Sequence, residues 1–339
     1  MRLVRFVWVF FFSISSTVCA SVAPENERWH IQGEYLYLLP SISQTAYAIQ
    51  KVAPFLPIPA GERFTNDPDF QSAYRIEGIY NFCNCWSDFR FQWTHLPKFH
   101  QTDSVARSAG ARGLLMAIQG YPLSQIGAFF FTNASSKISF EYHAVDALAG
   151  FYGIQNRTFR TLLQLGLQYA NFCFEEDLTY TSTDPVSFLS LVHLKNSSDL
   201  WGIGPELGFK VDYGIPYCQT LFHIPSALSL VAKARGALLV SHYNNVRFDY
   251  DTLGTPGLQL VNVKNPSRWD VIPFWDIRIG LNYALTFECL CTHLEVGYEM
   301  FSYRNVISRI QFPFITPLNF TLESNVSFQG PYAALGCSF

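Results

Sequence analysis

The stretch WDVIPFWDIRIGLNYALTF, residues 269–287, is the clearest structural signal in this sequence. Its central part alternates between an apolar and a polar set: Trp275, Ile277, Ile279, Leu281 and Tyr283 against Asp276, Arg278, Gly280 and Asn282. A period of two residues predicts a β-strand with one apolar and one polar face. Such a strand belongs either to a soluble sheet with one wet face or to a membrane barrel with a polar interior.

Nine other stretches alternate in the same way: residues 29–40, 72–82, 86–96, 136–145, 158–170, 200–213, 228–243, 293–300 and 326–339. Their polar faces repeatedly carry charges, and their apolar faces carry aromatic residues near the strand ends. This combination is typical of a barrel with a water-filled lumen and aromatic girdles at the level of the lipid head groups.

The composition favours the membrane interpretation. Of the 339 residues, 49% are hydrophobic, 17% are aromatic and only 14% are charged, whereas a soluble domain carries about 25% charged residues. The net charge of −3 gives no electrostatic support for binding nucleic acid. After the first 20 residues, no stretch offers 18 uninterrupted apolar residues for a spanning helix. The remaining membrane architecture is a closed β-barrel, because lipid cannot satisfy an open sheet edge.

The connections between the alternating stretches are short and long in turn. The predicted long connections are residues 41–71, 97–135, 171–199, 244–268 and 301–325. Outer-membrane barrels show this rhythm, with short periplasmic turns, long external loops and both termini in the periplasm. Residues 112–119 and 126–133 flank a turn-like Gly-Tyr-Pro and could be two further strands, or part of a loop that bends inward. We therefore expect an all-β transmembrane antiparallel barrel of about 12 strands, with 10–14 acceptable.

The two ends of the chain carry export and assembly signals. Met1–Ala20 has two arginines, an apolar core and a small-residue cleavage site before Ser21, which predicts a cleaved signal peptide and one barrel domain over 21–339. Phe339 ends an amphipathic final strand, as the assembly signal of bacterial outer-membrane barrels does. The expected partners are therefore outer-membrane lipid and the barrel assembly machinery.

The charged residues on the polar faces are the candidates for lining the lumen. Their assignment rests on alternation alone, and one bulge would reverse every assignment beyond it. The candidates are Arg75, Glu77, Asp88, Arg90, Lys137, Glu141, Arg160, Glu206, Lys210, Lys233, Arg235, Asp276, Arg278 and Glu295.

Seven cysteines remain after the predicted cleavage. The topology puts six of them near the periplasmic rim: Cys83, Cys85, Cys218, Cys289, Cys291 and Cys337. Two cysteines separated by one residue rarely pair with each other, and the periplasm is oxidising. We therefore expect disulfides to other envelope proteins or to further copies of this chain. Packing as small buried hydrophobic residues is the alternative.

The sequence contains no HExxH, nucleophile-elbow or P-loop pattern, so we expect neither an enzyme nor a cofactor. Asp67 with Asp69, and Asp249 with Asp251, could contact Ca²⁺, although solvated loop acids are the simpler interpretation, and no metal is expected. Glu141 and His143 share a strand face, but no nucleophile is visibly paired with them.

Seven stretches, in order along the chain, carry a family resemblance: WHIQGEYLYLLPS, AYRIEGIYNF, WSDFRFQWTHL, ISFEYHAVDAL, LLQLGLQYA, WGIGPELGFKVDYGI and HLEVGYEMFSYRN. The chain resembles the major outer membrane porin-like proteins of chlamydia-related bacteria and, more distantly, the Legionella major outer membrane protein family. The resemblance implies an outer-membrane barrel that forms a diffusion pore for small hydrophilic solutes, and it supplies no catalytic motif. The alternative is a disulfide-linked structural envelope protein or a surface adhesin.

Overall fold

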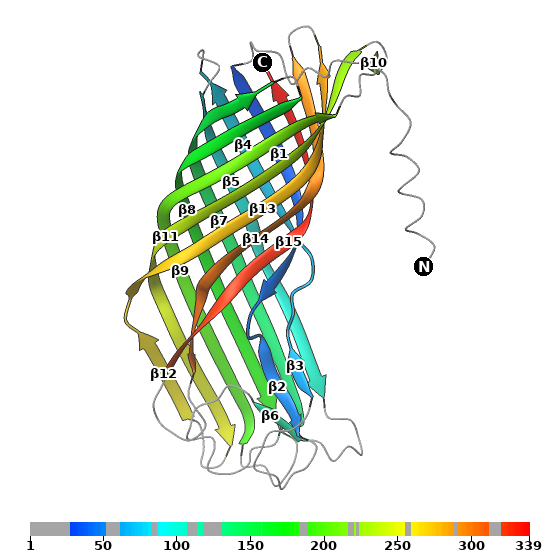
Figure 1. Ribbon diagram of the computed structural model, residues 1–339. Helices are drawn as coiled ribbons and strands as arrows, with labels where there is room; N and C mark the ends of the chain where they lie inside the picture. Colours follow the sequence, from blue (N-terminus) through cyan, green and yellow to red (C-terminus); the bar gives the residue numbers. More distant parts are fainter. Residues whose placement is uncertain are drawn as a thin grey trace.

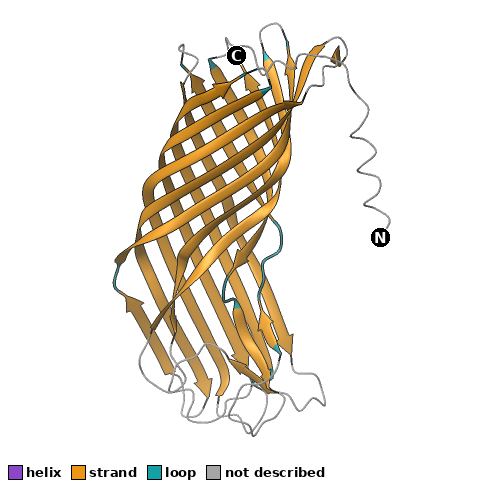
Figure 2. Cartoon of the chain, viewed as in Figure 1, coloured by secondary structure: helices purple, strands orange, loops and turns teal. Residues whose placement is uncertain are grey.

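A computed structural model describes twelve segments of the chain: residues 28–51, 62–82, 87–106, 114–117, 131–156, 158–182, 189–215, 220–221, 224–254, 259–287, 290–311 and 320–339. These segments form an antiparallel barrel of β-strands (Figures 1 and 2). No helix in these segments is long and apolar enough to cross a membrane.

Ten of the described strands close the barrel ring. In the order in which they pair, they are β1 (Trp29–Ile42), β4 (Gln71–Asn81), β5 (Ser87–Ala106), β7 (Asn133–Gln155), β8 (Phe159–Thr181), β9 (Leu189–Ile215), β11 (Ile224–Gly254), β13 (Arg268–Thr286), β14 (Cys291–Gln311) and β15 (Phe320–Ser338). The ring closes where β15 pairs with β1, from Ile31 opposite Cys337 to Ile42 opposite Val326. Closure leaves these strands without the free hydrogen-bonding edge that lipid cannot satisfy.

Five shorter strands lie outside this ring: β2 (Ala46–Lys51), β3 (Arg63–Thr65), β6 (Leu114–Ala117), β10 (Thr220–Leu221) and β12 (Gln259–Asn265). β2, β3 and β6 form a separate sheet at the end of the barrel opposite the C-terminus (Figure 1). The predicted strand over 112–119 is therefore β6, which pairs with β2 and adds nothing to the ring. Of the other predicted extra strand, 126–130 lie outside the described residues, and Phe131 forms an isolated bridge with Leu115.

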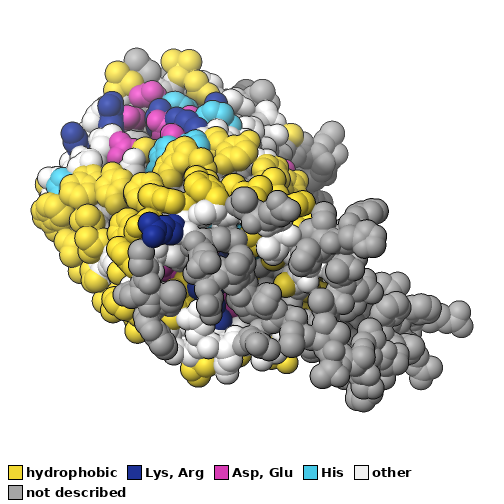
Figure 3. Space-filling view, turned by 90° about the horizontal axis from the view of Figure 1, so that it is seen from above, with side chains coloured by type: hydrophobic (Ala, Val, Ile, Leu, Met, Phe, Trp, Pro, Cys, Tyr) yellow, Lys and Arg dark blue, Asp and Glu magenta, His cyan; other side chains and the backbone are white. Residues whose placement is uncertain are grey.

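The strands are far longer than a membrane requires. A spanning β-strand needs about 9–11 residues, whereas β11 has 31 residues and β9 has 27. The outer face shows where lipid ends. Along β8 it carries the exposed residues Leu163, Leu165 and Leu167 near the periplasmic end, but Glu175 and Asp177 further along. Figure 3 shows this as a broad hydrophobic belt, with charged and histidine side chains gathered beyond one part of it.

An aromatic and histidine row marks the external edge of the belt. Neighbouring strands place His95, His143, Asn171, Trp201, His242 and Trp269 directly opposite one another in turn. His95 stacks on His143 with ring centroids 4.3 Å apart, and Trp201 meets Trp269 edge-on at 5.7 Å. Amphipathic rings of this kind favour the membrane–water interface.

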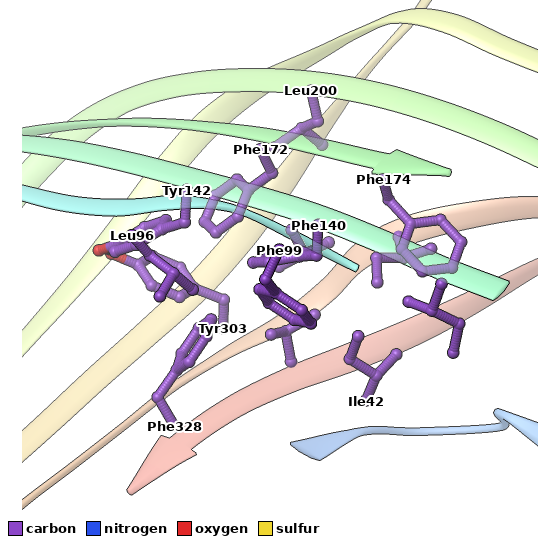
Figure 4. Close-up of a cluster of buried hydrophobic side chains, with 14 of the residues drawn as sticks. Ile42, Leu96, Phe99, Phe140, Tyr142, Phe172, Phe174, Leu200, Tyr303 and Phe328 are labelled. Atoms are coloured by element: carbon purple, nitrogen blue, oxygen red, sulfur yellow. The ribbon is translucent and has the colours of Figure 1, made fainter. Parts of the chain in front are cut away.

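The barrel interior changes character at the same level. Inside the lipid-facing belt, the inward positions carry charged side chains, and beyond the belt they carry a buried apolar cluster. The cluster includes Leu96, Phe99, Phe140, Tyr142, Phe172, Phe174, Tyr303 and Phe328 (Figure 4). Water surrounds the external extension, so its strands point most charges outward and apolar groups inward, as in a soluble sheet. The exception is the ion pair of Arg309 and Glu176, which lies buried in this interior with 3.3 Å between Nε and Oε2.

Two glycines allow neighbouring strands to approach closely, which gives a first prediction. A Cβ at Gly204 would lie 1.9 Å from the Leu238 carbonyl oxygen, and one at Gly166 would lie 2.0 Å from that of Ala147. Gly204→Ala should destabilise the barrel by about 2 kcal/mol, because the backbone must shift to relieve the overlap. The urea concentration that abolishes the fast-migrating folded gel band measures the effect.

Gly33 provides the matched control, because a Cβ at this lipid-facing residue would meet nothing within 4 Å. Gly33→Ala should unfold at the wild-type urea concentration. Equal stability of the Gly204→Ala and Gly33→Ala variants would contradict the close strand approach.

Candidate functional site

Twelve charged side chains form a layer across the interior of the lipid-facing part of the barrel, which we call the charged layer. It consists of Arg75, Arg90, Arg235 and Arg278 together with Glu34, Glu77, Asp88, Asp146, Glu206, Asp276, Glu295 and Glu299. Each of these residues is at most 8% exposed. They come from strands all around the ring, so the layer crosses the lumen rather than lining one wall.

Arg75 and Arg278 join one side of the layer. Arg75 donates to both oxygens of Glu299 and to Glu34 Oε2, the last at 3.1 Å. Arg278 contacts the same Glu34 and also Glu295, each at 2.8 Å. Its guanidinium lies 3.7 Å from the centroid of the Tyr332 ring. Glu34 therefore couples two arginines that reach it from β4 and β13.

Arg235 and Arg90 organise the rest of the layer. Arg235 contacts three carboxylates: Asp276 at 2.7 Å, Asp146 at 2.9 Å and Glu206 at 3.3 Å. Arg90 contacts Asp88 at 2.7 Å and Glu77 at 3.6 Å. Every arginine of the layer thus has at least two carboxylate partners. Charge-assisted contacts of this kind hold buried guanidinium groups in fixed positions.

Several buried polar atoms in and beside the layer accept or donate no hydrogen bond within the described part of the protein. Neither Nε2 nor Oε1 of Gln164 has a hydrogen-bond partner among the described residues, although the residue is 0% exposed. Gln168 Oε1 and Asp276 Oδ1 also have no hydrogen-bond partner. Buried polar groups in native proteins are almost always hydrogen-bonded, to protein or to water. Hydrogen bonds to water are one way to satisfy such buried atoms.

Ten of the predicted lumen residues are buried in the barrel interior: Arg75, Glu77, Asp88, Arg90, Glu206, Lys233, Arg235, Asp276, Arg278 and Glu295. Two more lie towards the periplasmic end of the interior and are half-buried. Lys210 Nζ is 3.3 Å from Asp212 Oδ1, and the Arg160 guanidinium lies 4.0 Å from the centroid of the Tyr152 ring.

The remaining two predicted lumen residues, Lys137 and Glu141, lie on the outer face of the external extension, and this placement corrects the expectation from sequence. Their strand neighbour Tyr142 is the one that points inward. The exposed Lys137 belongs to a row of opposite charges across four strands, facing Asp177, then Lys195, then Asp249. Sequence alternation predicts that the charged face of each strand points into the lumen. This prediction is correct only where lipid covers the outer face of the barrel.

Sequence reasoning missed three members of the charged layer: Glu34, Asp146 and Glu299. Glu299 lies four residues after Glu295 and so shares its face, a signal that could have identified it. Glu34 alternates with Tyr35 in the same way as the other candidates do. Alternation alone does not predict Asp146 in the lumen, because it assigns the face of Lys137 and Glu141, the opposite face of the strand, to the interior.

The apolar cluster closes the interior on the external side of the charged layer (Figure 4). Tyr142 and Tyr303 share a buried hydrogen bond of 2.8 Å between their hydroxyl oxygens. The Tyr142 ring also lies 5.1 Å from Phe172 and 5.7 Å from Phe328. These side chains come from β7, β8, β14 and β15, so they meet across the lumen.

A groove of about 600 Å³ lies on the outer wall of the barrel rather than in its interior. Its lining is mostly apolar and includes the exposed side chains Tyr35, Tyr74, Trp93, Leu294 and Leu335, and Glu34, Arg75 and His95 also border it. The groove adds no polar group to the interior site.

The cysteines are only partly within the described residues: Cys83, Cys85, Cys218 and Cys289 lie outside them. Among the described residues, Cys173 and Cys337 form no disulfide. Cys291 is 0% exposed, with its Sγ 3.8 Å from Thr286 Oγ1. The expected disulfide links of the periplasmic rim therefore remain a prediction.

Cys173 gives a second prediction, because it lies on the external extension beside Asp199 and Glu141. Burial, reinforced by these two carboxylates, raises the pKa of the Cys173 thiol to about 11. Alkylation needs the thiolate. The labelling rate at Cys173 in intact cells should therefore rise steadily with pH up to about pH 11, as followed by peptide mass spectrometry.

Asp199→Asn should move this labelling curve to lower pH, because it removes one of the carboxylates that disfavour the thiolate. Lys137→Gln serves as the control, since it lies elsewhere on the same outer face. Half-maximal labelling of wild-type Cys173 near pH 8.5, the value of a free cysteine, would contradict this environment.

The loop acids considered for Ca²⁺ are engaged locally. Asp67 accepts hydrogen bonds from Thr45 at 3.1 Å and Thr65 at 3.0 Å, and Asp249 accepts from Asn262 at 2.6 Å. In the described segments, no group of three or more His, Cys, Asp or Glu side chains is placed to hold a metal ion.

A closed barrel with a lipid-facing belt, an aromatic edge and a charged interior defines an outer-membrane β-barrel protein. The family model described as the Legionella pneumophila major outer membrane protein precursor matches residues 21–339. The chain belongs to this family and is located in the outer membrane. The family confirms the more distant of the two resemblances noted in the sequence.

Three solved structures illustrate the similarity. The outer membrane protease OmpT from Escherichia coli is 9% identical, with a TM-score of 0.45, over 94% of this chain and 99% of that chain. The Ralstonia pickettii toluene transporter TbuX is 11% identical, with a TM-score of 0.30, over 93% and 90%. The Pseudomonas aeruginosa outer membrane protein OprG is 13% identical, with a TM-score of 0.28, over 93% and 98%. A comparison with curated protein sequences gave no match.

Proposed function

We propose that this protein is an outer-membrane porin, a water-filled diffusion channel for small hydrophilic solutes whose pathway runs through the charged layer. The observation that carries the proposal is the Gln164 carboxamide, which is fully buried beside the layer and whose two polar atoms have no hydrogen-bond partner among the residues that the structure describes. A purely structural barrel gains nothing from such a group, because an unsatisfied buried amide costs about 1–3 kcal/mol. A hydrated pathway satisfies it with water.

Opening this pathway requires movement of two parts of the interior. The arginines of the charged layer can exchange partners, because each already contacts at least two carboxylates. The apolar cluster must be displaced on the external side, where Tyr142, Phe172 and Phe328 meet. The structure thus corresponds to a closed state of the proposed channel.

Swelling of liposomes that contain the purified protein tests this function. Proteoliposomes should swell in isotonic solutions of small sugars, and the rate should fall as the sugar becomes larger. Heat-dependent gel mobility shows independently that the reconstituted protein is folded. Folded protein that gives the swelling rate of empty liposomes for every sugar would contradict the porin proposal.

A structural or adhesive barrel is the second candidate, and the filled interior favours it. Residues of the apolar cluster such as Phe140, Phe172 and Tyr303 are at most 1% exposed. This candidate predicts no sugar flux. Together with the expected rim disulfides, it predicts high-mass species on non-reducing gels of outer membranes that collapse when reductant is added.

A further inference from the structure

The external end of β14 leaves the barrel wall and turns inward. Among the described residues, its pairing with β13 ends at Tyr303, and its pairing with β15 shifts register between Tyr303 and Ile307. Strands of a wall alternate between their two faces, whereas the five residues Val306–Ile310 are all at most 1% exposed. The Ser308 N–H donates to Ser198 Oγ of β9 at 3.2 Å. This end of β14 is therefore enclosed on both faces in the external mouth of the barrel.

The segment that follows β1 turns into the same mouth. Its residues Thr45–Ala48 are at most 3% exposed. The Tyr47 carbonyl oxygen accepts a hydrogen bond of 2.6 Å from the Tyr180 hydroxyl of β8, and the Tyr47 hydroxyl donates to Asp103 Oδ2 of β5 at 2.9 Å. The two inward segments together form what we call the external cap, residues 43–48 and 306–311.

Arg309 joins both parts of the external cap to the far wall. Its Nη1 donates to the Gln44 carbonyl oxygen at 2.6 Å, and its Nε lies 3.3 Å from Glu176 Oε2 of β8. The guanidinium also lies 4.8 Å from the centroid of the Phe174 ring. The strands β9, β11 and β13 separate β8 from β14 in the ring, so this side chain reaches across the mouth. One fully buried arginine thus connects β14, β8 and the segment after β1.

Both inward turns contain a residue with a left-handed backbone. The φ angle is 66° at Gln44 and 58° at Asn305, a conformation that residues other than glycine adopt only when their surroundings hold them in it. Asn325 of β15 holds both turns. Its carbonyl oxygen accepts from the Ser43 N–H at 3.1 Å, and its Oδ1 accepts from the Asn305 N–H at 3.0 Å. The two turns therefore lie side by side at the base of the external cap.

We infer that the external cap is the gate of the proposed channel, that Arg309 holds it shut, and that it swings about Gln44 and Asn305. The inference rests on the proposed channel function and adds the part of the molecule that controls opening. Hinges are a few residues at the ends of elements that absorb a large change in backbone angles. Loss of the Arg309 contacts releases both parts of the external cap at once, because the same guanidinium contacts Gln44 and Glu176.

Thiol labelling behind the gate tests the inference without any measurement of conductance. The probe is Ala48→Cys, at a 0% exposed position, in a chain whose native cysteines are serines. Arg309→Met with Glu176→Gln removes the contacts of the arginine and leaves no buried charge unpaired, so the barrel should fold. A membrane-impermeant maleimide should then label the probe in intact cells about tenfold faster, because a hydrogen bond to a charged group changes an equilibrium by at least this factor.

Lys98→Met with Glu175→Gln is the matched control. This pair has 3.4 Å between Nζ and Oε2, and it lies exposed on the outer wall of the external extension. Its removal should leave the labelling of Ala48→Cys unchanged. Ser104→Cys, at an exposed position on β5, should be labelled at the same rate in every background. Heat-dependent gel mobility shows that each variant is folded.

Single-channel recordings connect the external cap with the pore. Channels with Arg309→Met and Glu176→Gln should be open for a several-fold larger fraction of the time than wild-type channels, with the same conductance in each opening. Unchanged labelling of Ala48→Cys in this folded variant, or an equal rise in the Lys98 and Glu175 control, would overturn the gate and leave the channel function standing. Faster labelling in a protein that never conducts would overturn the channel function and leave a hinged cap.

Discussion

Replacing Arg278 by methionine should destabilise the barrel by about 3–5 kcal/mol, because it leaves buried carboxylates without their counter-charge. Arg278 contacts Glu34 and Glu295, each at 2.8 Å, and it is 5% exposed. Glu34 keeps Arg75 in the variant, but Glu295 loses its arginine. The temperature at which the folded gel band disappears on heating should fall well below that of the wild type.

Arg268→Met on the same strand is the matched control. Arg268 pairs with Glu323 and Asp270, but its side chain is 36% exposed, and exposed pairs contribute about 0–1 kcal/mol. Adding Glu295→Gln to Arg278→Met should recover part of the lost stability, because the second change removes the uncompensated charge. If the Arg278→Met barrel resists heat as well as the Arg268→Met barrel does, the ion pairs of Arg278 in the charged layer do not contribute the predicted stability.

Opening the apolar cluster should produce the largest functional change. In the double variant Tyr142→Ala with Phe328→Ala, two rings are lost from the point where β7 meets β14 and β15 across the lumen. We expect a several-fold increase in single-channel conductance, because these rings cover the charged layer on its external side. Each truncation of a buried aromatic costs about 3–5 kcal/mol, so the folded fraction must be measured in the same preparation.

Two further variants separate the opening of the lumen from a general loss of stability. Tyr142→Phe keeps the ring and loses only the hydrogen bond to Tyr303, so its conductance should equal that of the wild type. Tyr298→Ala removes an exposed, lipid-facing ring and should also leave the conductance unchanged. An unchanged conductance in the folded double variant would mean that the cluster does not obstruct the pathway.

Alternation along the chain predicted the strands of the ring well, but it could not give their lengths. The predicted loop 171–199 contains the end of β8, as far as Thr181, and the beginning of β9, from Leu189. Beyond the membrane the outer face of these strands carries charges such as Glu175 and Lys195, and a stretch of this kind resembles a polar loop. For the same physical reason the face of Lys137 and Glu141 was assigned wrongly.

The sequence predicts most residues of the charged layer, but it does not predict which arginine contacts which carboxylate. Arg75, Arg235 and Arg278 follow from the period of two residues in their strands. Their partners depend on which side chains meet across the lumen. Arg278 and Glu34, for example, are 244 residues apart in the chain. Such contacts appear only when the ring has closed.

A cysteine probe at Gln164 tests most directly whether solutes pass through the charged layer. In a chain whose native cysteines are serines, Gln164→Cys places a thiol beside the layer, and Leu165→Cys places one on the lipid-facing side of the same strand. A positively charged methanethiosulfonate should reduce the single-channel conductance of Gln164→Cys in discrete steps and leave Leu165→Cys unchanged. Modified Gln164→Cys channels that conduct as before would contradict a pathway through the charged layer.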